Sequence, residues 1–382
     1  MRDMRVAVVS ESFLPTVNGV TTSVCRVLDH LADNGHDAVV ISPHAGSPSH
    51  YRGFPVFQVP AVAYRQFPVG LPSLQVDRVL DEFAPDVLHV ASPFLLGARA
   101  LSAARRRGLP AVAIYQTDIA GFAKRNRLGL TAPLAWQLVR RMHEQADRTL
   151  VPSSAALADC LAAGIPRLAR WGRGVDIDRY HPRNRDRAGA RELRARLSPG
   201  GETVVGYVGR IAPEKQVERI RDLKGLPNTR FAIVGDGPAT PAVTKALRGM
   251  PVTFLGRRSG DDLADAYAAF DVFVHTGCEE TFGQTLQEAH ASGLPVVAPR
   301  SGGPIDLVDS GVDGALFEPG ERSGFRGAVE ALVGDAEQRA RMGEAGRRRV
   351  LDRSWDAVCA ELLEHYEQVV RERTALAAAA AR

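Results

Sequence analysis

Short runs of apolar residues alternate along the chain with longer stretches whose apolar residues recur every three or four positions. The short runs are rich in β-branched residues, which is typical of parallel strands covered on both faces. The longer stretches, such as residues 20–31, keep their apolar residues on one stripe and predict amphipathic helices. The alternation predicts an α/β fold. Predicted strands lie at residues 5–9, 38–42, 87–90, 111–115, 149–152, 203–208, 230–234, 252–255, 272–275 and 295–298.

The pattern is interrupted near residues 176–201, where a polar stretch contains Pro182 and ends in the turn sequence Ser198-Pro199-Gly200-Gly201. A chain of 382 residues is also longer than one compact domain usually is. We therefore predict two α/β domains, over residues 1–180 and 187–352, whose open sheets face each other across a cleft. Ligands of such sheets bind beyond the carboxyl ends of the strands, so functional residues should directly follow strands.

The ends of the chain carry no signal for a membrane span or for export. No window approaches 18 consecutive apolar residues. The apolar run at residues 6–9 is too short for the core of a signal peptide. We therefore expect a cytoplasmic protein without a transmembrane helix, and we expect the alanine-rich residues 374–382 to form a disordered tail.

Composition and cysteine spacing favour an ordinary globular protein. Hydrophobic residues make up 45% of the chain and charged residues 24%. The four cysteines have no paired spacing, which favours buried free thiols over a metal or redox site. They are Cys25, Cys160, Cys278 and Cys359.

The net charge of +4 is concentrated in the first half, where residues 1–182 carry 20 Lys/Arg against 15 Asp/Glu. Basic clusters stand at residues 105–107 and 124–127. Such an excess suits either an ordinary solvated surface or a first domain that meets an anionic membrane face. Nucleic acid is disfavoured as a partner, because no aromatic interleaving accompanies the charge.

The strongest chemical motif follows the predicted strand at residues 272–275. Thr281 and Gln284 have the spacing of a capping box, so a helix is expected to begin at Thr281. Glu280 immediately precedes this start and Glu288 lies two turns inside it, so the carboxylates are about 10–12 Å apart along the axis. One carboxylate is suited to the hydroxyls of a sugar and the other to those of a ribose. The alternative is a pair of acidic residues on a solvated helix.

A second motif follows the predicted strand at residues 203–208. Gly209 permits close backbone approach, and Arg210 and Lys215 are suited to converge on a diphosphate. Fixed cations stabilise a diphosphate leaving group more in the transition state than in the ground state, and they would replace a metal ion. The alternative is a surface ion pair of Lys215 with Glu214 or Glu218.

Two further candidates lie in the first half. Asn18 and Gly19 form a turn that opens the helix at residues 20–31 and would let backbone approach a phosphate or the acceptor, with Asn18, Gln116 and Asp118 on the acceptor side. Gln116 and Asp118 follow the strand at residues 111–115, where Asp118 would orient a hydroxyl or stabilise positive charge at an anomeric carbon, or else cap a helix. No GxGxxG sequence is present, which argues against a dinucleotide cofactor.

In this order and spacing the motifs resemble those of the retaining glycosyltransferases of the family-four type, which have the two-Rossmann GT-B fold. The resemblance covers nearly the whole chain. Beyond the motifs above it rests on residues 174–176, 180–182, 291–298, 302–303 and 354–355.

The resemblance implies that Arg210 and Lys215 bind the donor diphosphate, that Glu280 holds the transferred sugar and that Glu288 holds the ribose. It implies that a final helix over residues 355–373 returns to the first domain. The remaining donor-site residues that it implies are Gly19, Gly209, Gly256, Arg257, Thr281, Phe282, Gly283 and Gln284, with Gly256 and Arg257 at the base.

Within the family, residues 115–118 together with Thr281 and Gln287 are most similar to actinobacterial GDP-mannose-dependent α-mannosyltransferases that act on glycolipids such as glucuronosyl diacylglycerol. This similarity implies a metal-independent hexosyltransferase without a cofactor, which uses GDP-mannose and contacts the inner face of the plasma membrane. Two positions depart from the family pattern: many relatives carry His in place of Gln116 and Gly in place of Thr281.

Other activities stay open at this point. The donor is alternatively a UDP-sugar that carries glucose or sulfoquinovose, and the acceptor is alternatively a soluble sugar or natural product. Outside sugar transfer, the alternatives are a nicotinamide-dependent dehydrogenase, which the missing GxGxxG sequence disfavours, and a catalytically silent binding subunit.

Overall fold

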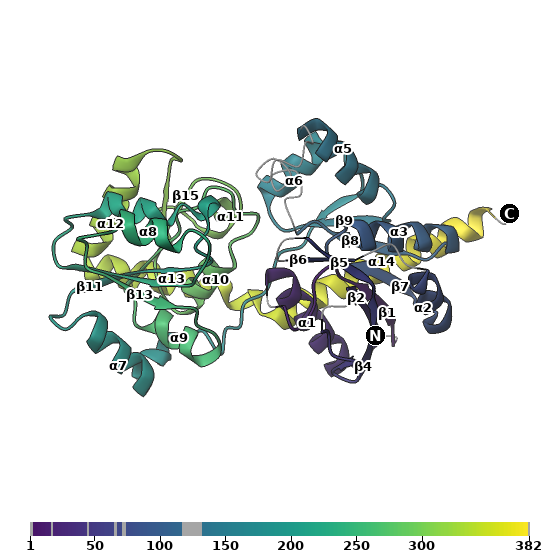
Figure 1. Cartoon of the computed structure of the whole chain (residues 1–382), viewed down its shortest axis with the longest axis horizontal. Helices are drawn as coiled ribbons and strands as arrows, with labels where there is room; N and C mark the ends of the chain where they lie inside the picture. The colour runs from purple at the N-terminus through teal and green to yellow at the C-terminus, as the bar shows by residue number, and fades with distance from the viewer. Residues whose placement is uncertain are drawn as a thin grey trace. The chain divides into compact units, whose positions relative to one another are not determined.

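A computed structural model describes residues 3–16, 18–43, 46–64, 67–70, 74–116 and 132–380 of the chain. The chain divides into two compact units (Figure 1). One comprises residues 1–172 together with 356–382, and the other comprises residues 173–355. Each unit is a parallel sheet with helices packed on both faces, as the alternation of apolar runs predicts.

The first unit contains an eight-stranded sheet in the order β10-β9-β8-β7-β1-β2-β4-β3, which is parallel except for the pairing of β3 with β4. Its strands are β1 (Arg5–Val9), β2 (Asp37–Pro43), β3 (His50–Tyr51), β4 (Phe54–Val59), β7 (Val87–Val90), β8 (Ala111–Ile114), β9 (Arg148–Val151) and β10 (Leu168–Arg170). A separate hairpin joins β5 (Ala61–Tyr64) to β6 (Phe67–Gly70). Its helices are α1 (Gly19–Asp33), α2 (Gln75–Phe83), α3 (Leu95–Arg107), α5 (Ala132–His143) and α6 (Ser154–Ala162), and the end of the chain adds α14 (Trp355–Ala380).

The last helix packs on the sheet of the first unit, on the face opposite α3. Leu88 and Val90 of β7 share a core with α2 and α3, whereas His89, which points the other way, hydrogen-bonds through Nδ1 to the hydroxyl of Tyr366 at 2.5 Å. The buried stripe of α14 is the one that its sequence periodicity predicts. It consists of Val358, Leu362, Tyr366 and Val369.

The second unit contains a six-stranded parallel sheet in the order β13-β12-β11-β14-β15-β16. Its strands are β11 (Thr203–Val208), β12 (Thr229–Val234), β13 (Val252–Gly256), β14 (Val272–Val274), β15 (Val296–Pro299) and β16 (Gly314–Phe317). Its α-helices are α7 (Ala188–Leu197), α8 (Thr240–Ala246), α9 (Gly260–Ala268), α10 (Gln284–Ala291), α11 (Pro304–Leu307), α12 (Arg322–Gly334) and α13 (Ala336–Val350). Its 3₁₀ turns are η1 (Pro182–Asp186), η2 (Pro213–Lys215), η3 (Val217–Leu223) and η4 (Leu351–Arg353).

Successive residues of these strands enter two different cores. Val204 and Val208 of β11 pack with residues of α7, α9 and α10, whereas Val205 and Tyr207 pack with residues of η3, α8 and α12. Both faces of the sheet are therefore buried, and this is why the strands are continuous apolar runs in the sequence. None of the helices in the described ranges is both long and apolar enough to span a bilayer.

The boundary between the units differs from the predicted one. Residues 173–180 pack in the second unit, where Val175 and Tyr180 join the core. The amide of Val175 donates to the carbonyl of Arg353 at 2.9 Å, and a Cβ on Gly174 would lie 2.5 Å from Cα of Trp355. The polar stretch with Pro182 therefore follows the crossing between the units instead of marking it.

The end of the chain also differs from its prediction. Residues 374–380 continue α14 as an exposed helix, whereas the alanine-rich composition had suggested a disordered tail. Alanine has the highest intrinsic helix propensity, so a helix that is already anchored on the sheet extends readily into this segment.

We expect Leu362→Ala to lower the free energy of unfolding of the first unit by about 2–5 kcal/mol, because it leaves a cavity where a leucine is 1% exposed. Leu376→Ala, on the same helix but 64% exposed, should change it by no more than about 0.5 kcal/mol. Urea unfolding followed by circular dichroism and tryptophan fluorescence measures both changes. Equal effects of the two substitutions would contradict the packing of α14 on the sheet.

Candidate active site

The loops that follow β11 and β12 are brought together by glycines. The amide of Gly209 donates to the carbonyl of Val234 at 3.0 Å, and the amide of Ile211 donates to that of Asp236 at 2.9 Å. A Cβ on Gly235, whose φ is +134°, would lie 1.9 Å from the carbonyl oxygen of Gly209. Only glycine fits there, so the backbone that precedes Arg210 lies directly against the next loop.

The 3₁₀ turn η2 carries Lys215 to the loop that follows β14. The hydroxyl of Thr276 donates to the carbonyl of Lys215 at 2.7 Å. A Cβ on Gly277 would lie 3.0 Å from Cα of Lys215. These contacts bring the basic motif and the acidic motif side by side, although they are far apart in the sequence.

Lys215 and Glu280 form a close ion pair, with Nζ of Lys215 2.6 Å from Oε2 of Glu280. Their side chains are only 21% and 18% exposed. Burial alone would raise the pKa of Glu280, but Lys215, the nearby His275 and the amide of Phe282 favour the charged form and lower that pKa to about 2. The alternative pairing of Lys215 with Glu214 or Glu218 is therefore wrong.

Arg210 is 51% exposed, and its nearest carboxylate is that of Glu214 at 3.9 Å. Its side chain therefore stays largely solvated at the carboxyl end of β11, in the loop that leads to Lys215. Strand β13 ends at Gly256, whose carbonyl accepts from the amide of Gly235 at 2.8 Å, and the exposed Arg257 follows it.

The helix of the acidic motif begins at Gln284, not at Thr281 as the capping-box spacing predicted. Gly283, with φ of +106°, stands at its N-cap, and the side chains of Thr281 and Gln284 do not cap it. Gln284 instead donates to the carbonyl of Gly174 at 3.0 Å, and Gln287 donates to that of Arg173 at 2.8 Å. The side chain of Gln284, which a capping box would have used, instead holds the distant residue Gly174. The capping-box spacing therefore predicted the wrong first residue of the helix.

Residues 280–283 form a tight loop in front of α10. The amide of Gly303 donates to the carbonyl of Glu280 at 2.7 Å, and Cβ atoms on Gly302 and Gly303 would lie 2.2 and 1.9 Å from backbone oxygens of this loop. Oε1 of Glu280 accepts from the amide of Phe282 at 3.4 Å. The paired glycines thus fix the backbone that presents the Glu280 carboxylate to Lys215.

Glu288, about one turn into α10, has a different environment from Glu280. Its Oε2 accepts from the hydroxyl of Tyr267 at 2.8 Å. Burial raises the pKa of Glu288 to about 7; Tyr267 opposes this shift, Asp176 adds to it and Arg179 opposes it. The two carboxylates that the sequence paired therefore differ in protonation near neutral pH.

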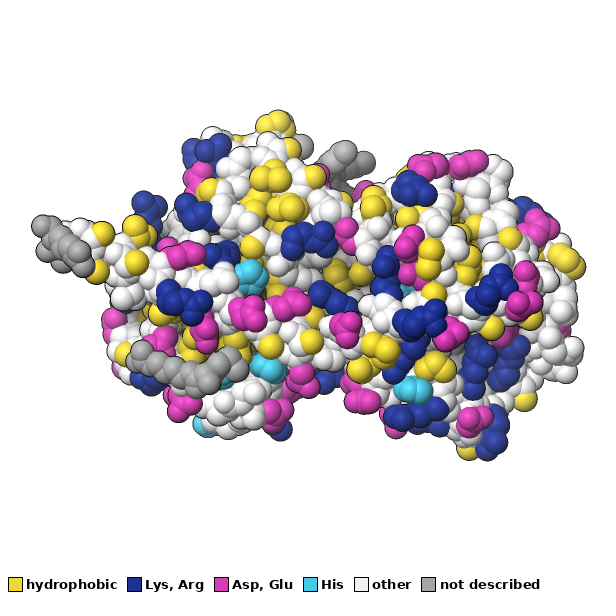
Figure 2. Space-filling model, turned by 180° about the vertical axis from the view of Figure 1, so that it is seen from behind, with side chains coloured by type: hydrophobic (Ala, Val, Ile, Leu, Met, Phe, Trp, Pro, Cys, Tyr) yellow, Lys and Arg dark blue, Asp and Glu magenta, His cyan; other side chains and the backbone are white. Residues whose placement is uncertain are grey.

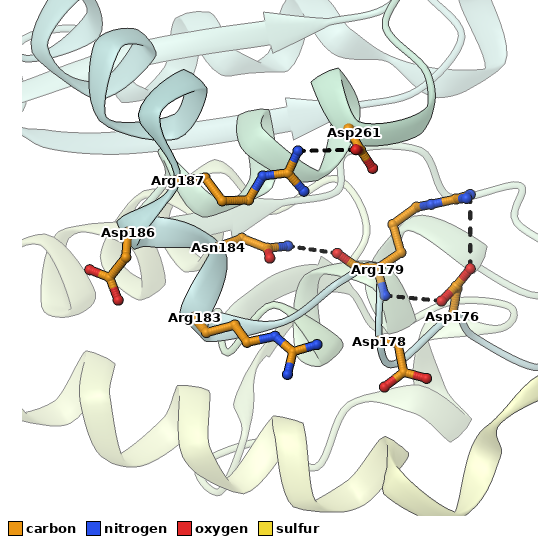
Figure 3. A pocket seen from close by; sticks show the side chains of 8 residues that line it. All are labelled: Asp176, Asp178, Arg179, Arg183, Asn184, Asp186, Arg187 and Asp261. Carbon is orange, nitrogen blue, oxygen red and sulfur yellow. Dashed lines mark hydrogen bonds and ion pairs between the residues drawn. The ribbon is translucent and has the colours of Figure 1, made fainter.

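Asp176 and Arg179, whose charges act on Glu288, belong to the lining of a charged groove of about 690 Å³ (Figure 3). The side chain of Arg187 lies 3.2 Å from Asp261, and that of Asn184 donates to the carbonyl of Arg179 at 2.6 Å. Sequence reasoning did not predict this groove. Its lining residues are Asp176, Asp178, Arg179, Arg183, Asn184, Asp186, Arg187 and Asp261.

In the first unit, Asn18 and Gly19 form the start of α1. Oδ1 of Asn18 caps the helix by accepting from the amides of Val20 and Thr21, and its Nδ2 donates to Ser12 at 2.7 Å. Gln116 is buried, and its Nε2 donates to the carbonyl of Ala91 at 2.8 Å. Asp118 lies outside the described residues.

Three residues of the second unit join the site without any sequence signal. Tyr267 reaches Glu288 from α9, Nε2 of His275 lies 3.9 Å from Oε2 of Glu280, and Arg173 lies close enough for its charge to interact with that carboxylate. Burial lowers the pKa of His275 to about 4, so this imidazole is neutral at pH 7. His275 is close to the acidic motif in sequence, whereas only long-range packing brings Tyr267 and Arg173 to it.

Comparisons with known proteins identify the family. Residues 17–179 match the model named Glycosyltransferase Family 4, and residues 190–349 match the model named Glycosyl transferases group 1. A GDP-mannose-dependent alpha-mannosyltransferase of Mycobacterium tuberculosis is 48% identical, over 99% of this chain and all of that protein. The chain belongs to the family-4 glycosyltransferases.

Other relatives and solved structures extend the comparison. A GDP-mannose-dependent alpha-mannosyltransferase of Corynebacterium glutamicum is 43% identical over 97% of this glycosyltransferase and 90% of that protein. The sulfoquinovosyl transferase SQD2 of Arabidopsis thaliana is 34% identical over 91% of this chain and 70% of that protein. Sucrose-phosphate synthase of Thermosynechococcus elongatus superposes with a TM-score of 0.80 at 20% identity, over 97% of this chain and all of that structure.

The crystal structure of Anabaena HepE in complex with UDP superposes on the glycosyltransferase with a TM-score of 0.79 at 20% identity, over 96% of this chain and all of that structure. These likenesses show the GT-B fold, which the resemblance implied. The family and the named relatives make the chain a hexosyltransferase.

Removing the positive charge of Lys215 should make the free energy of unfolding less dependent on pH. The folded-state pKa of Glu280, about 2, lies below its ordinary value of 4.5, so its ionisation stabilises the fold above about pH 4.5 and this contribution is lost as the pH falls toward 2. We expect Lys215→Met to be less stable than the wild type at pH 7 by about 1–3 kcal/mol. The difference should shrink between pH 4.5 and 2 in urea unfolding.

Lys245→Met serves as the matched control, because Lys245 is exposed on α8 away from the site. It should follow the wild-type curve at every pH. A constant stability difference between Lys215→Met and the wild type across this window would contradict the ion pair.

Proposed function

We propose that this glycosyltransferase transfers mannose from GDP-mannose to a glycolipid acceptor with retention of anomeric configuration. The observation that carries the proposal is the near-full-length identity of 48% with the M. tuberculosis protein named as a GDP-mannose-dependent alpha-mannosyltransferase. The arrangement of cations and carboxylates in the second unit supports a nucleotide-sugar donor, because it offers separate groups for a diphosphate and for hydroxyls.

In this proposal the donor binds at the carboxyl ends of β11, β13 and β14. Arg210 and Lys215 bind the diphosphate, and the backbone near Gly256 and Arg257 meets the base. Glu280 is kept ionised by its neighbours and only accepts hydrogen bonds, which suits the hydroxyls of the transferred sugar. Glu288 takes the hydroxyls of the ribose.

Catalysis in this proposal depends on charge stabilisation of the departing GDP. Negative charge grows on the diphosphate as the glycosidic bond breaks, so fixed cations stabilise the transition state more than the bound donor. A carboxylate with a pKa of about 2 is too weak a base to deprotonate a hydroxyl near neutral pH, so we assign the proton of the acceptor hydroxyl to the departing phosphate. We expect transfer without a divalent metal.

A lipid acceptor is supported by relatives and by one surface of the first unit. A relative in Acholeplasma laidlawii, 26% identical over 83% of this chain and 86% of that protein, is named Alpha-monoglucosyldiacylglycerol synthase. Helix α5 exposes Leu134 and Leu138, one turn apart, beside Arg140 and Arg141. Figure 2 shows hydrophobic side chains gathered near basic ones on this part of the unit. Such a surface suits peripheral contact with anionic lipids on the inner face of the plasma membrane.

Arg210→Ala should lower kcat/KM for GDP-mannose by about 100- to 1,000-fold, because it removes one fixed cation from the diphosphate. The fold should be unaffected, since the side chain is half exposed. Mannosyl transfer to a glycolipid in mixed micelles measures the change. Arg221→Ala, on the exposed surface of η3, is the matched control and should keep wild-type activity.

The wild-type assay also compares donors and products. GDP-mannose should be used and UDP-glucose should not, EDTA should leave the rate unchanged, and the product should be the α-anomer by nuclear magnetic resonance. Preference for UDP-glucose would favour the alternative of a UDP-sugar donor. Anabaena HepE, which shares the fold, is bound to UDP in its crystal structure. Undiminished turnover by folded Arg210→Ala would refute the diphosphate role.

Replacing both exposed leucines of α5 with serine should weaken binding to anionic phospholipid vesicles by at least about tenfold, because each apolar side chain contributes about 1.5–3 kcal/mol when it is buried in the lipid. Vesicle flotation measures this binding, and slow hydrolysis of the soluble donor should be unchanged. Leu376→Ser, an exposed leucine on α14, is the control. Equal vesicle binding by the double variant and the wild type would contradict membrane contact through α5.

A further inference from the structure

Tyr267 is a fully buried tyrosine in the last turn of α9, beside the candidate active site. Its ring packs edge-on against Tyr180 with 5.4 Å between centroids, and it also contacts Phe270 and Phe273 at 6.2 and 5.8 Å. Aromatic packing on several sides fixes the position of the ring. The hydroxyl group is therefore held in one place, and it points at α10.

The hydroxyl of Tyr267 has two acceptors on α10 and one proton. It lies 2.8 Å from Oε2 of Glu288 and 3.3 Å from the carbonyl oxygen of Thr285. It can donate to only one of them at a time. Among the described residues, none donates a hydrogen bond to Oε1 of Glu288.

Few charged groups act on the carboxylate of Glu288. Asp176 and Arg179, both in the lining of the groove in Figure 3, are the charged groups that act on it, and they have opposite effects. Tyr267 faces it from α9. Since the two charges oppose each other, the hydroxyl of Tyr267 is the main group that favours the ionised form of Glu288 against its burial.

We propose that Tyr267 is a positioning residue of the donor site, whose hydroxyl holds Oε2 of Glu288 and leaves Oε1 free to accept from the ribose hydroxyls. This inference rests on the proposed function, which assigns the ribose to Glu288. When Glu288 is protonated, its proton goes to the oxygen of Tyr267 and the proton of Tyr267 goes to the carbonyl of Thr285. Ribose binding requires the opposite arrangement, in which the carboxylate is ionised.

The proposal links nucleotide binding to ionisation. Because burial raises the pKa of Glu288 to about 7, this carboxyl group is protonated in a fraction of the molecules near neutral pH. Ribose hydroxyls donate to the ionised form, so binding expels that proton. The affinity for the nucleotide should therefore rise as the pH increases through about 7 and level off above it.

The test is isothermal titration calorimetry of GDP binding between pH 5.5 and 8.5. Tyr267→Phe should weaken GDP binding about tenfold at pH 7, a typical loss for one hydrogen bond to a charged group. Loss of this hydrogen bond also raises the pKa of Glu288, so the midpoint of the pH dependence should move upward. The shift separates positioning from a purely structural role, which would weaken binding equally at every pH.

A ligand without ribose hydroxyls provides the reference. Binding of 2′,3′-dideoxy-GDP should be weaker in the wild type and should not change in Tyr267→Phe. Its phosphates titrate as those of GDP do, so the difference in protons released by the two ligands, measured in buffers of different ionisation enthalpy, reports Glu288 alone. This comparison uses the wild type, so it decides the proposal even where Tyr267→Phe fails to fold.

Two further variants separate the possible failures. Tyr366→Phe removes a buried tyrosine hydroxyl in the first unit and should leave GDP binding unchanged. Glu288→Gln should abolish the preference for GDP over the dideoxy ligand. If it does not, the proposed ribose role itself is wrong.

If Glu288→Gln behaves as expected but Tyr267→Phe binds GDP with wild-type affinity and pH midpoint, the positioning role is overturned and the ribose role stands. The positioning role is also overturned if Tyr267→Phe weakens GDP and the dideoxy ligand equally. Equal proton release by the wild type with GDP and with the dideoxy ligand would also overturn the positioning role.

Discussion

The ion pair between Lys215 and Glu280 is the interaction on which the candidate active site depends. Each of the two groups would be costly to bury alone, and each makes burial of the other tolerable. The pair joins the loop after β11 to the loop after β14, the two segments that the proposed function assigns to diphosphate and sugar. The glycines at 277, 302 and 303 let backbone approach closely enough for this contact.

The second carboxylate shows how environment gives two like residues different properties. Glu280 and Glu288 lie eight residues apart, yet a lysine stabilises the charge of one and a tyrosine is the hydrogen-bond partner of the other. The first is ionised at any physiological pH, and the second is poised near neutrality. A site built in this way can hold one permanent acceptor for a sugar and one acceptor whose charge responds to the ligand.

Helix α10 connects this site to the segment where the chain enters the second unit. The side-chain amides of Gln284 and Gln287 hold the carbonyls of Gly174 and Arg173. The charge of Arg173 in turn acts on Glu280. The same helix therefore carries Glu288, follows Glu280 in the sequence and holds residues 173–174. The packing of this segment and the geometry of the site are thus linked.

The sequence by itself determined the two parallel sheets, nearly all of their central strands and the order of the motifs. Hydrophobic periodicity and the residues that directly follow strands are local signals, so they can be found without the tertiary structure. It did not determine that Lys215 pairs with Glu280 sixty-five positions away, that α10 begins at Gln284, or that Tyr267 meets Glu288. Those outcomes depend on which loops the sheet brings together and on which polar groups find partners there. Spacing along a chain carries no information about such contacts, so only the tertiary structure decided them.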